Sequence, residues 1–125
     1  NDNDDNGGVV SASLHTPGDV DWYQYQGDDD VTGNVNPERE VVASAGLRLC
    51  KFLECNVGLD ETEFECPVGT QYGLSPMGRA GCCAEGGVAL PDLNCTGTFD
   101  DSATVYIRVD APERPCVTYS VAYHY

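Results

Sequence analysis

The sequence predicts an all-β fold, an antiparallel β-sandwich that forms a single domain over residues 1–125. Apolar and polar residues alternate with period two in several short segments, which is typical of half-buried strands. The 14 glycines and 7 prolines leave little uninterrupted sequence for helices. A chain of 125 residues is also the size of one domain with one hydrophobic core.

Five segments of the chain are predicted to form strands, each rich in β-branched and aromatic residues. A turn with the sequence HTPGD connects the first two, and the third contains a break at Gly46 and so holds one or two strands. The last two segments form the clearest strand pair, joined by a turn with the sequence APERP. The segments are residues 9–14, 20–26, 39–52, 104–110 and 116–125.

Seven cysteines in so short a chain indicate disulfides formed in an oxidising compartment, since no CxxC pair suggests zinc or thioredoxin-like chemistry. Five of them fall in residues 54–98, where glycines and prolines recur and the strand pattern is lost. We expect this region to be a disulfide-rich irregular insertion. Three intramolecular disulfides are predicted among Cys50, Cys55, Cys66, Cys82, Cys83 and Cys95, with the pairing left open.

Cys116 is predicted to be the odd thiol, because it begins the last strand, far from the other cysteines. Two alternatives follow for its environment. A free cysteine packs well as a small buried hydrophobe. Alternatively, the thiol is free at the surface or bridges to another chain.

The charge of the chain restricts its partners. With 21 acidic and 6 basic residues the net charge is −15, which repels nucleic acid and anionic membrane surfaces and attracts cations. No segment approaches the ~20 apolar residues that span a bilayer. Since the chain starts at Asn1, we expect it to be a mature form from which a signal peptide has been removed.

Three motifs follow an Asn/Asp-rich start in a characteristic order along the chain. They are GDVDWYQY, then DSATVYIRV, then the terminal YSVAYHY. This order resembles the bacterial pre-peptidase C-terminal domain family, with its D-x-D-W-[YF]-x-[FY] strand and its closing strand pair. The resemblance covers residues 9–26 and 102–125 and is absent from the cysteine-rich middle. It implies a jelly-roll-like sandwich, secretion, and a non-catalytic accessory role beside exported enzymes.

The same resemblance implies a calcium site. In family members that bind calcium, ligands come from an acidic N-terminal linker and from the two Asp residues of D-x-D-W. Asp19 and Asp21 match that motif directly, whereas Asp2, Asp4 and Asp5 match the linker in character only.

The residues of the N-terminal segment, residues 1–8, are also suited to calcium by their own chemistry. Calcium takes about six to eight oxygen ligands from carboxylates, amides and backbone carbonyls. The sequence NDNDDNGG supplies such oxygens as in the first half of an EF-hand loop, but no closing Glu follows, which excludes an EF-hand. A solvated acidic tail is the alternative.

Trp22 is the only tryptophan and lies on an alternating strand. We expect it to pack in the core, with Val20 and Gln24 on the same face; a sugar-stacking platform is the alternative. His15 lies in a turn and His124 is penultimate, and no catalytic motif accompanies either histidine. The chain is therefore predicted not to be an enzyme.

Two functions are consistent with the sequence. One is a secreted, calcium-stabilised, non-catalytic module that binds or stabilises an extracellular protein or polysaccharide. The other is a free-standing extracellular subunit that self-assembles with copies of itself into a filament or a layer at the cell surface. The first is the predicted function, since the family resemblance favours it, and the second is the alternative.

Overall fold

The computed structural model describes residues 8–27, 46–55, 62–63, 66, 68–85, 94–95 and 103–123. These residues form strands, turns and short connections, and no helix occurs among them. The strands are β1 (Gly8–Leu14), β2 (Asp21–Gly27), β3 (Arg48–Cys55), β4 (Thr62–Glu63), β5 (Thr70–Leu74), β6 (Ala80–Glu85), β7 (Asn94–Cys95), β8 (Ala103–Asp110) and β9 (Val117–Tyr123). The predicted all-β class is therefore confirmed.

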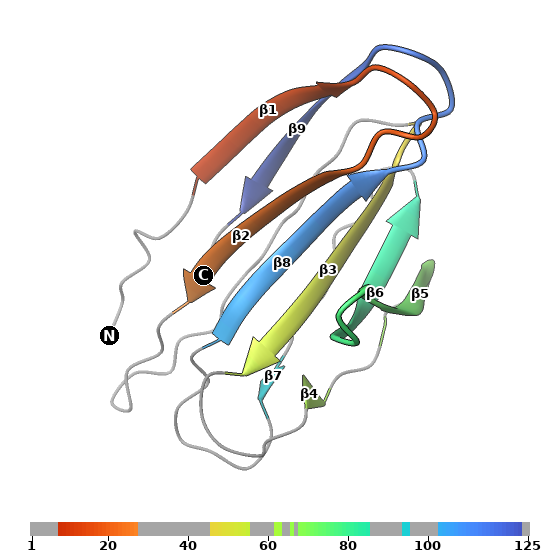
Figure 1. Cartoon of the computed structure of the whole chain (residues 1–125). Helices are drawn as coiled ribbons and strands as arrows, with labels where there is room; N and C mark the ends of the chain where they lie inside the picture. Colours follow the sequence, from red (N-terminus) through yellow and green to blue (C-terminus); the bar gives the residue numbers. More distant parts are fainter. Residues whose placement is uncertain are drawn as a thin grey trace.

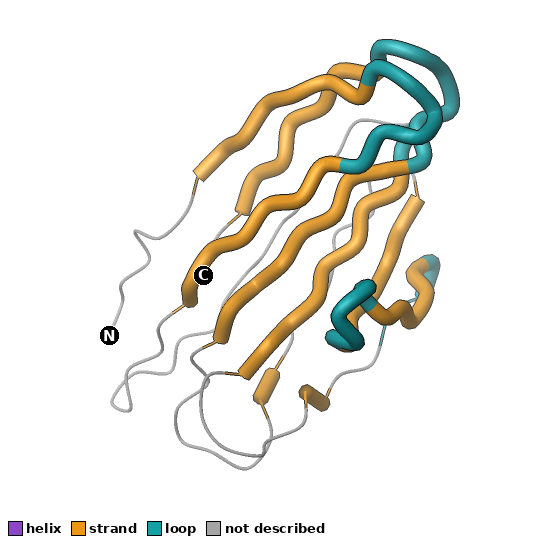
Figure 2. Tube along the Cα trace, viewed as in Figure 1, coloured by secondary structure: helices purple, strands orange, loops and turns teal. Residues whose placement is uncertain are grey.

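The strands form an antiparallel β-sandwich. One sheet is the pair β1–β9, and the other has five strands in the order β2-β8-β3-β6-β5 (Figure 1). A further two-stranded piece, β4–β7, lies at one end of the five-stranded sheet. The two connections that cross between the layers, residues 15–20 and 111–116, lie together at the opposite end (Figure 2).

The core lies between the two layers and is formed by alternate residues of the strands. Leu14 of β1 and Val117, Tyr119 and Val121 of β9 face the inner side of the five-stranded sheet. That side is lined with buried apolar residues: Leu49, Leu53, Cys82, Ala84, Ala103, Val105, Ile107 and Val109. The period-two pattern of the strands thus groups these residues on the face that forms the interior.

The last two predicted strands do not pair with each other. β8 pairs with β2 and β3, whereas β9 pairs with β1, so residues 111–116 cross from one layer to the other. The prediction of a terminal hairpin was wrong for a physical reason. The apolar faces of β8 and β9 pack against each other across the core, whereas in a hairpin they would line the same sheet.

Four of the described strands, β4 to β7, occur inside the region that was expected to be irregular. β5 and β6 form an antiparallel hairpin whose turn is closed by hydrogen bonds from Ser75 N to Arg79 O at 2.8 Å and from Arg79 N to Ser75 Oγ at 3.0 Å. Gly78 in this turn has a φ of +80°, a conformation that favours glycine. Turn chemistry and disulfides therefore order a segment without a clear strand pattern.

Disulfides attach both faces of β6 to the rest of the fold. Cys83 bonds to Cys50, its direct cross-strand partner on β3, and the neighbouring Cys82 bonds to Cys66 on the other face of the sheet. Cys55 is disulfide-bonded as well. Five of the six cysteines predicted to form disulfides are thus bonded; the side chain of Cys95 lies outside the described residues.

Candidate binding cleft on the five-stranded sheet

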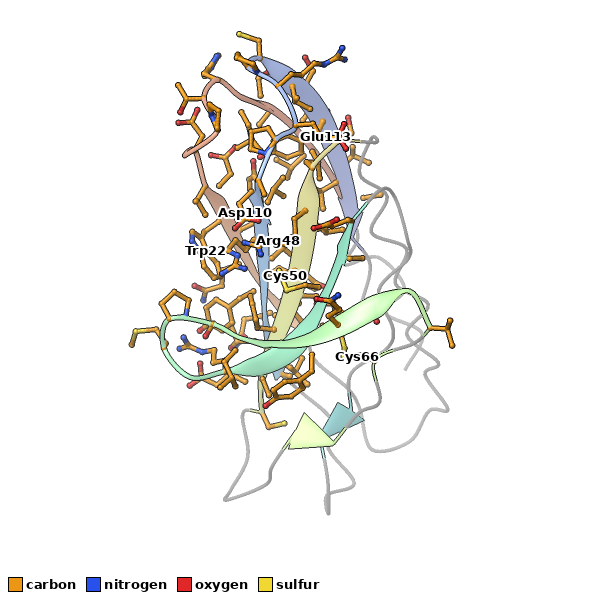
Figure 3. All side chains as sticks on the ribbon, turned by 90° about the vertical axis from the view of Figure 1, so that its right-hand side faces the viewer. Trp22, Arg48, Cys50, Cys66, Asp110 and Glu113 are labelled. Atoms are coloured by element: carbon orange, nitrogen blue, oxygen red, sulfur yellow. A yellow bond between two sulfur atoms is a disulfide. The ribbon has the colours of Figure 1, made fainter. Side chains whose placement is uncertain are left out.

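The outer face of the five-stranded sheet, which points away from the core, has polar and aromatic residues at the alternate positions. The pairing registers of β2 with β8 and of β8 with β3 place these residues in rows across the three strands. One row is Trp22, Arg108 and Cys50, and the next is Gln24, Tyr106 and Phe52. We call this surface the outer face. Figure 3 shows Trp22, Arg48 and Asp110 together on it.

Trp22 is held on the outer face by its neighbours. Its ring stacks on that of Phe52 with 5.9 Å between ring centroids and 30° between planes. The Arg108 guanidinium lies 5.7 Å from the centroid of Trp22 and 5.6 Å from that of Phe52. Phe52 is fully buried beneath these groups, whereas Trp22 remains 42% exposed. Stacking and cation–π contacts therefore fix the orientation of an exposed indole.

The prediction that Trp22 packs in the core was wrong. Tyr23 and Tyr25 are the residues of β2 that pack against the core, and Trp22 lies on the opposite side of the strand with Gln24. The glutamines were the signal in the sequence: an alternate row that contains Gln24 and Gln26 is the solvent side of a strand. Val20, expected on the same buried face, is 46% exposed.

A cleft of about 420 Å³ lies beside Trp22, in the size range of small-ligand sites. The strands contribute Trp22, Gln24 and Tyr106 to its lining. The turn between β5 and β6 projects to this side of the sheet (Figure 3). It supplies the remaining wall, which includes Ser75, Pro76, Met77 and Arg79. Residues from distant parts of the sequence thus line one cleft.

Arg79 forms part of one wall of the cleft and contacts both Glu54 and Tyr106. Its Nε donates a hydrogen bond to Glu54 Oε2 at 2.6 Å, and its guanidinium lies 4.1 Å from the ring centroid of Tyr106. The Tyr106 hydroxyl donates to the same Glu54 oxygen at 3.0 Å. The hydrogen bond from Arg79, and then that from Tyr106, lower the pKa of Glu54. The carboxylate is therefore used to hold the wall in place.

Two further arginines on the outer face share one carboxylate. Arg48 donates to both oxygens of Asp110, at 2.7 and 2.6 Å, and Arg108 Nε lies 3.2 Å from Asp110 Oδ2. The hydrogen bond to Asp110 raises the pKa of Arg48. Arg108 also donates to Cys50 Sγ at 3.3 Å, beside the Cys50–Cys83 bond. A second hollow of about 290 Å³ adjoins Arg48, Arg108 and Glu85.

Asp19 stabilises the turn between β1 and β2. Its carboxylate accepts hydrogen bonds from His15 N at 2.6 Å, Thr16 N at 3.0 Å and Thr16 Oγ1 at 2.7 Å. The side-chain hydrogen bond from Thr16, followed by the backbone ones, lowers the pKa of Asp19 below its ordinary value of 3.8. This is a turn-capping role of the kind that aspartate commonly has.

Asp21 belongs to a network between the two layers of the sandwich. The Tyr119 hydroxyl donates a short hydrogen bond to Asp21 Oδ2 and lies 2.6 Å from the hydroxyl oxygen of Tyr23. Burial, and then the hydrogen bonds to Asp21 and Tyr23, raise the pKa of Tyr119 well above its ordinary value. The network joins β2 to β9, so Asp21 also has a structural role.

The predicted calcium ligands are only partly within the described residues. Asp2, Asp4 and Asp5 lie outside them, while Asp19 and Asp21 make the hydrogen bonds given above. Within the described part of the chain, no group of three or more His, Cys, Asp or Glu side chains is arranged to hold a metal ion. The calcium site stays a prediction.

Cys116 is a free cysteine and is exposed, so the alternative of a buried cysteine was wrong. It lies at the end of the connection between the layers, with a φ of +60°, and its backbone N–H donates to His15 O at 3.4 Å. It shares the solvent face of the terminal segment with Thr118 and Ser120, as the alternation predicts.

Comparisons with protein-family models, with curated proteins and with solved structures give no match. The resemblance to pre-peptidase C-terminal domains therefore stays a prediction. No helix long and apolar enough to cross a membrane occurs among the described residues.

Proposed function

We propose that the chain is a secreted, non-catalytic β-sandwich module that contacts an extracellular protein or polysaccharide through the outer face of its five-stranded sheet. The exposed and rigidly held Trp22 beside a ligand-sized cleft carries this proposal. A large exposed aromatic ring is costly to keep in water, and such rings are enriched where proteins bind partners. The disulfides support secretion, because they form in oxidising compartments.

Stabilisation by calcium is part of the proposal. The net charge of −15 attracts cations. Asp19 lies in the crossing between the layers, and Asp21 is the first residue of β2. A bound ion that prefers the folded state would add to its stability. The non-catalytic role is supported at the cleft by Glu54, whose carboxylate accepts hydrogen bonds from Arg79 and Tyr106 within the fold.

Co-sedimentation with washed, insoluble extracellular material from the producing cells tests this function. Wild-type protein should sediment with the material and release neither reducing sugars nor amino groups from it. A Trp22→Ala/Met77→Ala variant should remain in the supernatant. A Val9→Ala/Ser11→Ala variant, changed at exposed residues on the other sheet, should sediment like wild type. Equal sedimentation of all three proteins would contradict a role for the outer face.

Cys116 favours a second candidate function, a subunit that assembles with copies of itself. An exposed, free thiol in an oxidising compartment is available to bridge two chains. Size-exclusion chromatography and non-reducing gels of wild type and Cys116→Ser test this function. Assembly that disappears in the variant would support the second function; unchanged assembly, or a monomer in both cases, would remove Cys116 from the argument.

A further inference from the structure

We propose that the cleft beside Trp22 binds a neutral saccharide, with one sugar ring stacked on the indole and its hydroxyls hydrogen-bonded by Gln24 and Ser75. This inference rests on the proposed binding function and deepens it by naming the class of ligand. It depends on three properties of the cleft: a rigid aromatic surface, unused polar groups, and compensated charges.

The aromatic surface is organised before any ligand arrives. The buried Phe52 ring stacks on the Trp22 ring, and the Arg108 guanidinium contacts both rings. The remainder of the indole lines the cleft and is exposed. The faces of pyranose rings carry C–H groups and pack well on flat aromatic rings. Because the indole is already fixed in orientation, little conformational freedom is lost when a sugar stacks on it.

Two polar side chains with unused hydrogen-bonding capacity lie next to this surface. Gln24 is exposed two positions along β2 from Trp22 and lines the cleft, and its side chain makes no hydrogen bond within the described residues. Its carboxamide both donates and accepts. Ser75 Oγ accepts a hydrogen bond from Arg79 N and keeps its own O–H for donation. Such groups match sugar hydroxyls, which also donate and accept.

The charges at the outer face argue for a neutral ligand. Arg79 is paired with Glu54, and Arg48 and Arg108 share Asp110 with Glu85 opposite Arg48 in the register. Each of these three arginines has a carboxylate neighbour, so none of them is left to select an anionic group. The net charge of −15 also repels acidic polysaccharides at longer range.

A peptide fits the cleft less well than a sugar. Peptides that bind sheets by main-chain pairing add to the edge of a strand. β2 is an edge strand of the five-stranded sheet, but the cleft lies over the outer face of β2 and β8, where the Trp22 ring and the side chains of Gln24 and Tyr106 line it. Recognition on that face uses side chains, which favours a stacked ring with hydroxyls around it.

Fluorescence titration provides a direct test, because Trp22 is the only tryptophan and its emission reports on the cleft alone. The probes are cellohexaose, laminarihexaose, xylohexaose, mannohexaose and chitohexaose. Alginate is the acidic probe and a proline-rich decapeptide is the peptide probe. We expect saturable changes in emission with at least one neutral hexasaccharide and none with alginate. Isothermal titration calorimetry gives the dissociation constants independently.

Variants locate the site. Trp22→Ala should raise the dissociation constant by about tenfold or more, and Gln24→Ala should raise it several-fold. Trp22→Tyr, which keeps a smaller ring, should lie between Trp22→Ala and wild type. Val9→Ala removes an exposed apolar side chain from the other sheet and should leave binding unchanged. Thermal melts show whether each variant folds. If Trp22→Ala does not fold, the dissociation constants of Gln24→Ala and Met77→Ala test the site instead.

The outcomes separate this inference from the proposed function. If no neutral hexasaccharide binds and co-sedimentation is abolished when the extracellular material is digested with protease, the partner is a protein; the module function then stands and the saccharide inference is overturned. If a saccharide binds equally to wild type, Trp22→Ala and Gln24→Ala, the assigned site is overturned. If neither sugars nor extracellular material bind, both proposals are overturned.

Discussion

Trp22 and Phe52 stack on each other although their strands are not neighbours: β8 lies between β2 and β3, and the two rings meet above it. The register explains this contact, because Trp22 lies opposite Arg108 and Phe52 opposite the adjacent outward residue Tyr106. Phe52 also covers Gly81, where a Cβ would collide with the Lys51 carbonyl oxygen and the Phe52 ring. The glycine thus makes room for the ring that supports the indole.

Phe52 is expected to contribute much more to stability than Trp22. Phe52→Ala removes a fully buried ring and should lower the free energy of unfolding by ~3–5 kcal/mol. Trp22→Ala removes a ring that is 42% exposed and should cost about 1 kcal/mol. Urea denaturation measures both, with Val9→Ala as the surface control. Equal losses for the two aromatic variants would mean that Trp22 is a core residue after all.

The Cys50–Cys83 disulfide is expected to stabilise the sheet by restricting the unfolded chain. It joins residues separated by 33 positions, and its removal in Cys50→Ala/Cys83→Ala should cost ~2–4 kcal/mol. Cys116→Ser changes an exposed free cysteine and should alter stability by less than about 0.5 kcal/mol. Chemical denaturation under non-reducing conditions compares the variants. A double variant as stable as wild type would show that the β3–β6 pairing needs no covalent link.

Asp19 is expected to make the turn between β1 and β2 sensitive to acid. Because its pKa is lowered in the folded state, its contribution is present above the unfolded value of about 3.9 and is lost as the pH falls through the folded pKa. Melting curves from pH 6 to pH 2 should therefore show wild type and Asp19→Asn converging at low pH. Thr16→Val removes the main cause of the shift, so NMR titration should find a higher pKa for Asp19 in that variant. An unchanged Asp19 pKa would contradict the assigned hydrogen bond.

Calcium is expected to raise the melting temperature of wild-type protein relative to protein in chelator, because it binds the folded state. Asp19→Asn and Asp21→Asn remove hydrogen bonds of the fold as well as predicted ligands, so each variant must be compared with itself in calcium and in chelator. The difference between the two conditions should shrink in both variants. Identical wild-type melting curves in calcium and chelator would eliminate the site.

A variant of the N-terminal segment separates the two parts of the predicted calcium site. Asp2→Asn/Asp4→Asn/Asp5→Asn leaves the hydrogen bonds of Asp19 and Asp21 untouched. If the segment contributes ligands, this variant should melt like wild type in chelator and gain less from calcium. A full calcium effect in the triple variant would support the alternative of a solvated acidic tail.

The sequence determined which residues of each strand share a face, because side chains alternate across a strand whatever its partner. Alternation puts Val105, Ile107 and Val109 on one face of their strand, and puts Cys116 on the more polar face, opposite Val117 and Tyr119. Its cysteine content likewise indicated disulfides, because a thiol-rich chain of this size is typical of oxidising compartments.

Only the tertiary structure decided which strands pair, which cysteines bond and which side of β2 meets water. Alternation specifies the faces of a strand but not its neighbour, so β8 and β9 looked like a hairpin although they lie in opposite layers. Disulfide pairing depends on separation in space: Cys50 and Cys83 have Cα atoms 4.0 Å apart because β3 and β6 are aligned. The cleft is likewise a tertiary feature, since Trp22 and the turn containing Met77 meet only when the sheet is assembled.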